Sequence, residues 1–169
     1  MVNDENSNPH GPLAKSGSTV NVVEFNARFG DPETEAVLPR LGGSFAQALM
    51  NAAKGCLRDS DIVVKDECAA TVIIASGGYP GSYEKGKPIS GLLPVDAASS
   101  PRQQTSIVFH CGTKAEGEKV VTSGGRVLSV TGMGATLREA VDRAYDGVKR
   151  ISFEGMFYRK DIAHRAFER

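Results

Sequence analysis

The two strongest structural signals in the chain lie in one stretch, Arg126-Val-Leu-Ser-Val-Thr-Gly-Met-Gly-Ala-Thr-Leu-Arg-Glu-Ala-Val-Asp-Arg-Ala-Tyr-Asp-Gly-Val-Lys-Arg-Ile151. Its beginning, Arg126–Thr131, is rich in aliphatic and β-branched residues and predicts a strand. Thr136-Leu-Arg-Glu139 then has the pattern of an N-terminal capping box. Apolar residues recur after it at helical spacing, at Leu137, Val141, Ala144, Val148 and Ile151. The stretch therefore predicts a strand followed by a strongly amphipathic helix.

Short strands surround this unit in the sequence. Four further runs are expected to be strands: Ala69–Ala75, Ile89–Leu93, Ser106–His110 and Lys119–Thr122. Ser123-Gly-Gly125 separates the last of these runs from Arg126, and we expect a hairpin turn there. Loops are expected at the glycine-rich Ser76–Tyr83 and at Asp96–Gln104. Because strands and helices do not alternate regularly, the pattern favours an α+β fold of short antiparallel strands with one strong amphipathic helix.

The N-terminal third of the chain carries weaker signals. Met1–Thr19 is polar and rich in Asn, Ser, Gly and Pro, which predicts a disordered or exposed tail. Val20–Phe25 predicts a strand, and Pro32–Leu38 predicts a short helix with proline in its first turn. Ser44 is expected to cap a longer helix, with Gln47 reaching back to the cap. The expected buried face of that helix comprises Ala48, Leu49, Ala52 and Cys56.

The composition of the 169-residue chain excludes several classes of protein. The 20 basic residues balance the 20 acidic residues and there is no Trp, which argues against nonspecific nucleic-acid binding. No apolar run approaches the roughly 20 residues needed to span a membrane. The N-terminus lacks the apolar core of a signal peptide, so a cytoplasmic location is expected.

Neither the cysteines nor the histidines indicate a catalytic site. Cys56, Cys68 and Cys111 contain no C-x-x-C pair and are expected to be reduced and packed as small hydrophobic residues. His110 precedes Cys111 directly, but neighbours on a strand point to opposite faces, which argues against a base and nucleophile pair. We expect His110 and His164 to be structural or surface residues.

The densest cluster of polar groups is Glu24-Phe-Asn-Ala-Arg-Phe-Gly-Asp-Pro-Glu33. Glu24 and Asn26 lie two residues apart at the end of a predicted strand, so their side chains face the same way. Carboxylate and amide oxygens are ligands that Mg²⁺ prefers, and Arg28 can grip a carboxylate or a phosphate. By spacing alone, the Glu24 and Asn26 pair can equally be solvated surface, and Asp31 can be a plain turn residue or a helix cap.

Several runs along the chain closely resemble the phosphoribosylamine–glycine ligase family, also called glycinamide ribonucleotide synthetase. The first is Arg28-Phe-Gly-Asp-Pro-Glu33. The others are Ala75-Ser-Gly-Gly-Tyr-Pro-Gly-Ser-Tyr-Glu-Lys-Gly86, Val108-Phe-His-Cys-Gly-Thr-Lys114, Gly125-Arg-Val-Leu-Ser-Val-Thr131 and Phe153-Glu-Gly-Met-Phe-Tyr-Arg-Lys-Asp-Ile162. Motifs in the right order are far more specific than any one of them, and together they cover roughly residues 20–165.

The resemblance implies a domain division and a reaction. Residues 20–64 would form the end of an ATP-grasp domain, and residues 65–169 the small C-terminal domain of this synthetase type. In this family ATP phosphorylates the carboxylate of glycine, and the amine of 5-phosphoribosylamine attacks the glycyl phosphate to make a purine precursor. By the same resemblance, Glu24 and Asn26 would hold Mg²⁺ or Mn²⁺.

Further site residues are expected beside this metal pair. From its charge and its proximity, Arg28 would act catalytically by steadying the glycine carboxylate or the acyl phosphate. The candidate substrate-binding residues are Asp31, Ser76, Gly77, Gly78 and Tyr79. The glycine-rich loop 76–83 would lie close to the phosphoribosyl group or, equally, form only a tight structural turn.

Only the C-terminal part of the family pattern is found in this chain. The N-terminal domain, the ATP-grasp lid and most of the ATP-binding domain would precede Val20, so we expect no turnover by the chain alone. Two hypotheses follow: the C-terminal part of a working ligase, completed by an N-terminal ligase segment, or a noncatalytic module that docks to a partner chain. A ligase of purine synthesis with another acceptor fits the later motifs poorly. Truncation predicts an exposed apolar patch on Val20–Leu57.

Overall fold

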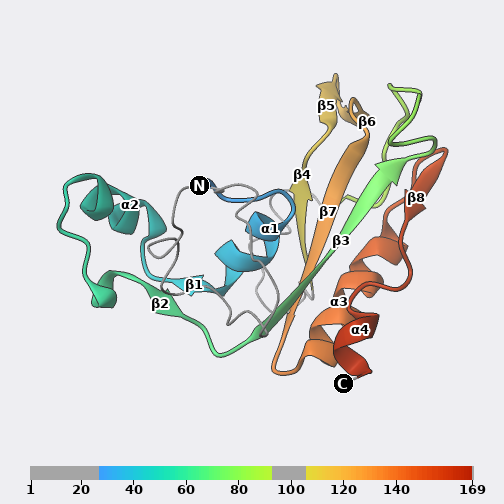
Figure 1. Cartoon of the computed structure of the whole chain (residues 1–169). Helices are drawn as coiled ribbons and strands as arrows, with labels where there is room; N and C mark the ends of the chain where they lie inside the picture. Colours follow the sequence, from blue (N-terminus) through green and yellow to red (C-terminus); the bar gives the residue numbers. More distant parts are fainter. Residues whose placement is uncertain (1–26, 93–105, 169) are drawn as a thin grey trace, which may run out of the picture.

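The computed structural model of the chain describes residues 27–92 and 106–168. Within these residues, four antiparallel strands form the main sheet in the order β4-β7-β3-β8 (Figure 1). The strands are β4 (Ser106–His110), β7 (Arg126–Gly134), β3 (Cys68–Ser76) and β8 (Met156–Tyr158). The strands predicted from Ala69–Ala75, Ser106–His110 and Arg126–Thr131 are confirmed. The strand predicted at 20–25, the tail at 1–19 and the loop at 96–104 lie outside the described residues.

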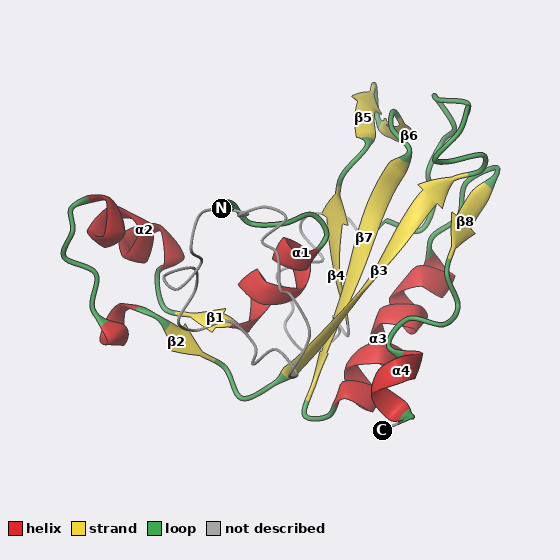
Figure 2. Cartoon of the chain, viewed as in Figure 1, coloured by secondary structure: helices red, strands yellow, loops and turns green. Residues whose placement is uncertain are grey.

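The amphipathic helix predicted from the sequence is α3 (Leu137–Arg150), and it covers one face of the sheet (Figure 2). Thr136 caps it by accepting the Glu139 N–H at 3.2 Å, and the Glu139 carboxylate accepts the Ala135 N–H. The core between helix and sheet is fully buried at Ile74, Leu128, Val130, Ala144 and Val148. Burying such aliphatic side chains is the main force that holds helix and sheet together.

The opposite face of the sheet is polar, and α1 (Glu33–Val37) lies against it. Thr131 points away from α3, and its Oγ1 donates to the carbonyl oxygen of Glu35 at 2.9 Å. Thr71 lies beside it in the sheet, with 2.7 Å between the two hydroxyl oxygens. The short helix predicted at Pro32–Leu38 is therefore confirmed, and a 3₁₀ turn at Leu38–Arg40 continues it. The sheet therefore fixes the position of α1 and of the polar run that precedes it.

Residues 41–64 form an arm that stands away from the sheet (Figure 1). It holds β1 (Leu41–Gly42), α2 (Phe45–Ala53) and β2 (Val63–Val64), and β1 pairs with β2. Ser44 caps α2 as predicted, but Gln47 donates to Asn51 instead of returning to the cap.

The buried face predicted for α2 is wrong, because only Ala48 is buried. Leu49 is 51% exposed, and Cys56 is also exposed. Large apolar side chains of this region lie in solvent: Phe29, Val37, Leu49, Met50, Leu57, Ile62, Val63 and Val64. Five of these side chains, Phe29, Val37, Leu49, Met50 and Leu57, belong to the described part of Val20–Leu57, where an exposed apolar patch is expected. The helical pattern of α2 is real, but the described residues do not supply its packing partner.

The predicted hairpin at Ser123-Gly-Gly125 is wrong. β6 (Lys119–Thr122) pairs with β5 (Thr113–Glu116), whereas β7 pairs with β3 and β4. The turn therefore passes the chain from a two-stranded sheet into the main sheet. The hairpin between β5 and β6 turns at Gly117, whose φ of 59° favours glycine.

The remaining segments settle two further predictions. Ile89–Leu93 is not a strand where it is described: Ser90 forms an isolated bridge with Ser152, and the Ile89 N–H donates to the Val120 carbonyl oxygen of β6. All three cysteines are free, but Cys56 and Cys111 are exposed and only Cys68 is half-buried, so their expected packing is wrong for two of them. The basic end of the chain forms the short α4 (His164–Phe167). No helix in the described ranges has the length and apolarity to cross a membrane.

Candidate functional site

Three loops meet at the end of the sheet where β3 terminates. The Ser76 N–H donates to the Gly125 carbonyl at 2.8 Å, and Ser76 Oγ donates to the Gly124 carbonyl at 3.0 Å. A Cβ at position 77 would lie 2.7 Å from the Gly155 carbonyl oxygen, so the third loop approaches the first backbone to backbone. Glycine is required at position 77 for this approach. The loops after β3, before β7 and before β8 are thereby locked together.

The aromatic part of the glycine-rich loop packs onto the same junction. The Tyr79 ring lies directly on Gly125, where a Cβ would be 2.1 Å from the ring. Tyr79 and Tyr83 meet edge to face with ring centroids 6.2 Å apart. Gly78 has a φ of 96°, a conformation that strains other residues. Gly78 and Tyr79, two of the predicted substrate-binding residues, therefore have clear structural roles.

A small pocket of about 140 Å³ opens beside Ser76 and Gly77. Its other walls are Glu84, Lys87, Glu154 and Gly155. The Lys87 ammonium lies 2.7 Å from Glu84 and 3.1 Å from Glu154. The Lys87 backbone is anchored to β6, since its N–H donates to Thr122 Oγ1 and its carbonyl accepts the Thr122 N–H. The pocket thus presents one ammonium, two carboxylates and closely packed backbone.

The charges in this pocket shift one another's titration. The hydrogen bond from Lys87 lowers the pKa of Glu84, and the charge of Lys87 lowers it further. Reciprocally, the hydrogen bonds to Glu84 and Glu154 raise the pKa of Lys87. Two carboxylates face one ammonium here, so the formal charge of the pocket is negative.

Lys87→Met is expected to raise the pKa of Glu84 towards its ordinary value, because both favourable contacts of that carboxylate disappear. The depressed pKa contributes stability above the unfolded-state pKa of Glu84, and this contribution fades as the pH falls through the lower folded-state pKa. Carboxyl-carbon NMR against pH would measure the shift. Lys85→Met is the control, since Lys85 lies over the Tyr83 ring and makes no ion pair with Glu84. An unchanged Glu84 titration in Lys87→Met would contradict the assignment.

The signature-like run 28–33 is attached to the same end of the sheet by Arg126, the first residue of β7. Its Nη1 lies 3.1 Å from Asp31 Oδ1 and donates to the Asp31 carbonyl oxygen at 3.2 Å. Ser76 binds the carbonyl group immediately before Arg126. The structure therefore brings the predicted residues Asp31, Ser76 and Gly77 to neighbouring positions on one short segment, 124–126.

The predicted catalytic residue, Arg28, is not brought into this arrangement. Arg28 is exposed, and its Nη1 donates to the Phe29 carbonyl oxygen. Glu24 and Asn26 lie outside the described residues. Across 27–92 and 106–168, no three His, Cys, Asp or Glu side chains cluster closely enough to hold a metal ion.

Three residues of this region were missed by sequence reasoning: Lys87, Arg126 and Glu154. Arg126 and Glu154 lie within runs that carry the family resemblance, which is the one signal that could have singled them out. Their partners can be distant in sequence: Asp31 and Arg126 have a sequence separation of 95. No local pattern reveals such pairs.

His110 and Cys111, which are neighbours in the sequence, each contact other residues in the structure. His110 Nδ1 lies 2.9 Å from Thr113 Oγ1. Burial raises the pKa of the Cys111 thiol, which a hydrogen bond with Ser129 offsets only in part. A thiol that stays protonated is a poor nucleophile. The expectation that this adjacency carries no catalysis agrees with these contacts.

Comparisons with known proteins agree on one family. The family described as "Phosphoribosylglycinamide synthetase, C domain" matches residues 69–165. The phosphoribosylamine–glycine ligase of Streptomyces coelicolor is 52% identical over 155 residues, which are 91% of this chain and 36% of that protein. The bifunctional purine biosynthetic protein PUR2,5 of Pichia angusta is 45% identical over 148 residues, 87% of this chain and 18% of that protein.

A solved structure gives the same result. The crystal structure of phosphoribosylamine–glycine ligase from Thermotoga maritima matches 83% of this chain and 32% of its own, with a TM-score of 0.68 and 34% sequence identity. The chain thus spans about a third of the length of the single-function ligases it matches.

Proposed function

Because the chain belongs to the phosphoribosylglycinamide synthetase C-domain family, we propose that it is the C-terminal part of an ATP-dependent ligase that joins glycine to 5-phosphoribosylamine. The observation that carries the proposal is the match over 91% of the chain to a ligase at 52% identity. ATP would activate the glycine carboxylate as glycyl phosphate, and the amine of phosphoribosylamine would displace phosphate from it. We place this reaction in the cytoplasm, within purine synthesis.

Residues 20–64 would be the end of the ATP-grasp domain, and residues 65–169 the C-terminal domain that packs against it. Glu24 and Asn26 would hold Mg²⁺ or Mn²⁺, which would neutralise charge on the ATP phosphates. Arg28 would face the glycine carboxylate or the acyl phosphate. Asp31 would be held for the reaction by Arg126, whose guanidinium contacts both its carboxylate and its carbonyl oxygen.

The pocket beside Ser76 and Gly77 suits one end of phosphoribosylamine better than the other. Lys87 already contacts two carboxylates there, so the pocket repels a phosphate group. An amine or ribose hydroxyls would instead find carboxylate and backbone acceptors. We therefore assign Ser76 and Gly77 to the amine or ribose part of the substrate.

The apolar arm supports a requirement for a partner segment. Leu49, Met50, Val63 and Val64 are each more than half exposed, and a two-stranded ribbon such as β1–β2 is marginal alone. An exposed apolar surface of this kind typically marks an interface. The proposed partner is the N-terminal segment of the ligase, which would supply the rest of the ATP site.

The test is glycine-dependent ADP formation with Mg-ATP and freshly generated phosphoribosylamine. We expect no turnover by the chain alone, and turnover once a separately expressed N-terminal segment of the Streptomyces coelicolor ligase is added. Glu24→Ala is expected to abolish the restored activity. Turnover by the chain alone would refute the proposal that the ATP site of this chain is incomplete. No activity in either arrangement would favour the alternative, a noncatalytic module that docks to a partner chain.

A further inference from the structure

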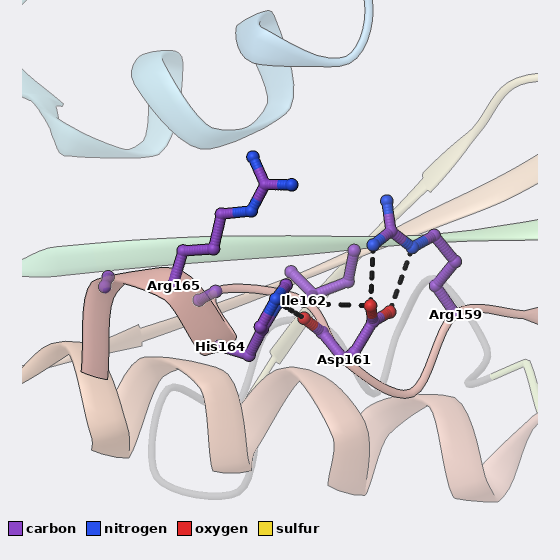
Figure 3. Close-up of a pocket in the computed structure, with 7 residues that line it drawn as sticks. Arg159, Asp161, Ile162, His164 and Arg165 are labelled. Atoms are coloured by element: carbon purple, nitrogen blue, oxygen red, sulfur yellow. Dashed lines mark hydrogen bonds and ion pairs between the residues drawn. The ribbon is translucent and has the colours of Figure 1, made fainter. Parts of the chain in front are cut away.

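A second and larger pocket lies between β8 and the C-terminus, whereas Glu154 and Gly155 of the first pocket precede β8. It has a volume of about 390 Å³ and is lined by residue 159 and residues 161–166 (Figure 3). Its charged groups are two arginines, one histidine and one aspartate. This pocket plays no part in the proposed ligase reaction as described above.

The backbone of the pocket is held in place by one side chain of α3. Tyr145 Oη donates to the Arg159 carbonyl at 2.9 Å and accepts the Ile162 N–H at 3.1 Å. The segment on both sides of Asp161 is thereby fixed to the helix. Ala163 follows with a φ of 66°, a left-handed conformation that is strained for a residue with a Cβ. Such strained positions persist only where surrounding contacts fix them, and they concentrate at functional sites.

Arg159 is oriented by Asp161 yet keeps most of its donors. Its Nε and Nη2 donate to the two carboxylate oxygens of Asp161 at 2.9 and 2.7 Å. A guanidinium has five N–H groups, so three remain for another acceptor. The two-point contact fixes the plane of the guanidinium group before any ligand arrives.

Arg165 and His164 supply further donors at the same pocket. Arg165 makes no hydrogen bond or ion pair within the described residues, and Figure 3 shows its guanidinium on the same side of the segment as that of Arg159. His164 Nδ1 lies 2.7 Å from the Asp161 carbonyl oxygen, so this nitrogen carries the proton and donates. The other ring nitrogen has no partner among the residues described.

We propose that this pocket binds a phosphate monoester, with Arg159 and Arg165 as the two arginines that grip its oxygens. The positive charges exceed the negative charge of Asp161 by at least one, and an oxyanion would complete the unused donors. Planar guanidinium groups match phosphate oxygens in a two-point geometry, and the three terminal oxygens of a phosphate monoester can meet two arginines at once. The pocket volume admits a sugar phosphate as well as inorganic phosphate.

The test is calorimetric titration of the full chain with inorganic phosphate and, separately, with ribose 5-phosphate at constant ionic strength. We expect saturable binding of one equivalent. Arg165→Gln is expected to weaken it about tenfold, equivalent to about 1.4 kcal/mol. Because Arg165 has no partner within the described residues, its replacement is expected to leave the fold intact, which far-ultraviolet circular dichroism checks. Arg159→Gln should weaken binding at least as much.

Lys160→Gln is the matched control, since Lys160 is an exposed cation in the same segment that does not line the pocket. It should leave the affinity unchanged. Tighter binding of ribose 5-phosphate than of inorganic phosphate is expected of a monoester site, and equal or weaker binding of the sugar phosphate would overturn that assignment. The proposal is overturned if neither probe saturates or if Lys160→Gln weakens binding as much as Arg165→Gln. The pocket needs no other segment, so a failed ligase assay would leave it untouched.

Discussion

Gly132→Ala is expected to lower the free energy of unfolding by about 3 kcal/mol, the upper end of the usual cost of overpacking a core. Gly132 lies on β7 where α3 crosses it. A Cβ there would lie 2.1 Å from the Ala140 carbonyl oxygen and 2.5 Å from the Ala144 N–H nitrogen. Both contacts are with helix backbone, which cannot rotate away as a side chain can. The helix would have to move from the sheet and loosen the whole core.

Urea denaturation followed by circular dichroism measures this effect as a lower transition midpoint with an unchanged slope. Gly42→Ala is the control, because a Cβ at position 42 would approach no atom closer than 3.4 Å, an ordinary contact. Its stability should change by no more than about 0.5 kcal/mol. Equal losses in the two variants would show that the close approach of β7 and α3 is not what makes Gly132 necessary.

Elements of this chain are predicted correctly where the evidence lies within the element itself, and wrongly where the structure depends on residues distant in sequence. α3, β3 and β4 were predicted because each carries its own evidence: a capped amphipathic period, or a continuous apolar run. The hairpin at Ser123-Gly-Gly125 was predicted wrongly because turn residues reveal that the chain bends but not which strand it then joins. β7 takes its partners from β3 and β4, and the pairing of long-range strands leaves little local trace.

In the arm and at the candidate site, too, the local sequence does not reveal which residues contact one another. The apolar face of α2 was recognised, but a helical period does not state whether a partner covers it, and Leu49 lies in solvent. At the site, Asp31, Ser76 and Gly77 were selected through the family resemblance. Lys87 and Arg126, which hold the charges there, were missed because their partners are identified only by the folded geometry.

Arg126→Ala is expected to lower kcat of the ligase reconstituted with the N-terminal segment roughly hundredfold, the scale on which small displacements of reacting groups act. The effect on stability should stay below about 1 kcal/mol, because the ion pair with Asp31 is partly solvated and such pairs contribute little. The side chains of Arg126 and Asp31 are 37% and 56% exposed, respectively. Loss of activity without loss of stability is the signature of a residue that positions the run 28–33 and does not merely hold the fold.

The chain offers a closely matched control in Arg143. That arginine also donates to one backbone carbonyl, Met133 O at 2.7 Å, and pairs with one carboxylate, Glu139, at a similar exposure. Arg143→Ala should therefore cost similar stability and leave kcat unchanged. If it lowers kcat as much as Arg126→Ala, the activity loss reflects general loosening of the domain.

A double-mutant cycle decides whether Arg126 acts through Asp31. Asp31→Asn removes the charge but keeps the carbonyl oxygen that Arg126 also binds, so its own effect on kcat should be the smaller one. Once Arg126 is alanine, Asp31→Asn should have little further effect, because residues that act as one unit are not additive. Arg126→Lys should restore only part of the activity, since an ammonium lacks the planar fork that meets two oxygens. Additive losses would instead mean that Arg126 contacts substrate directly, with Asp31 as a bystander.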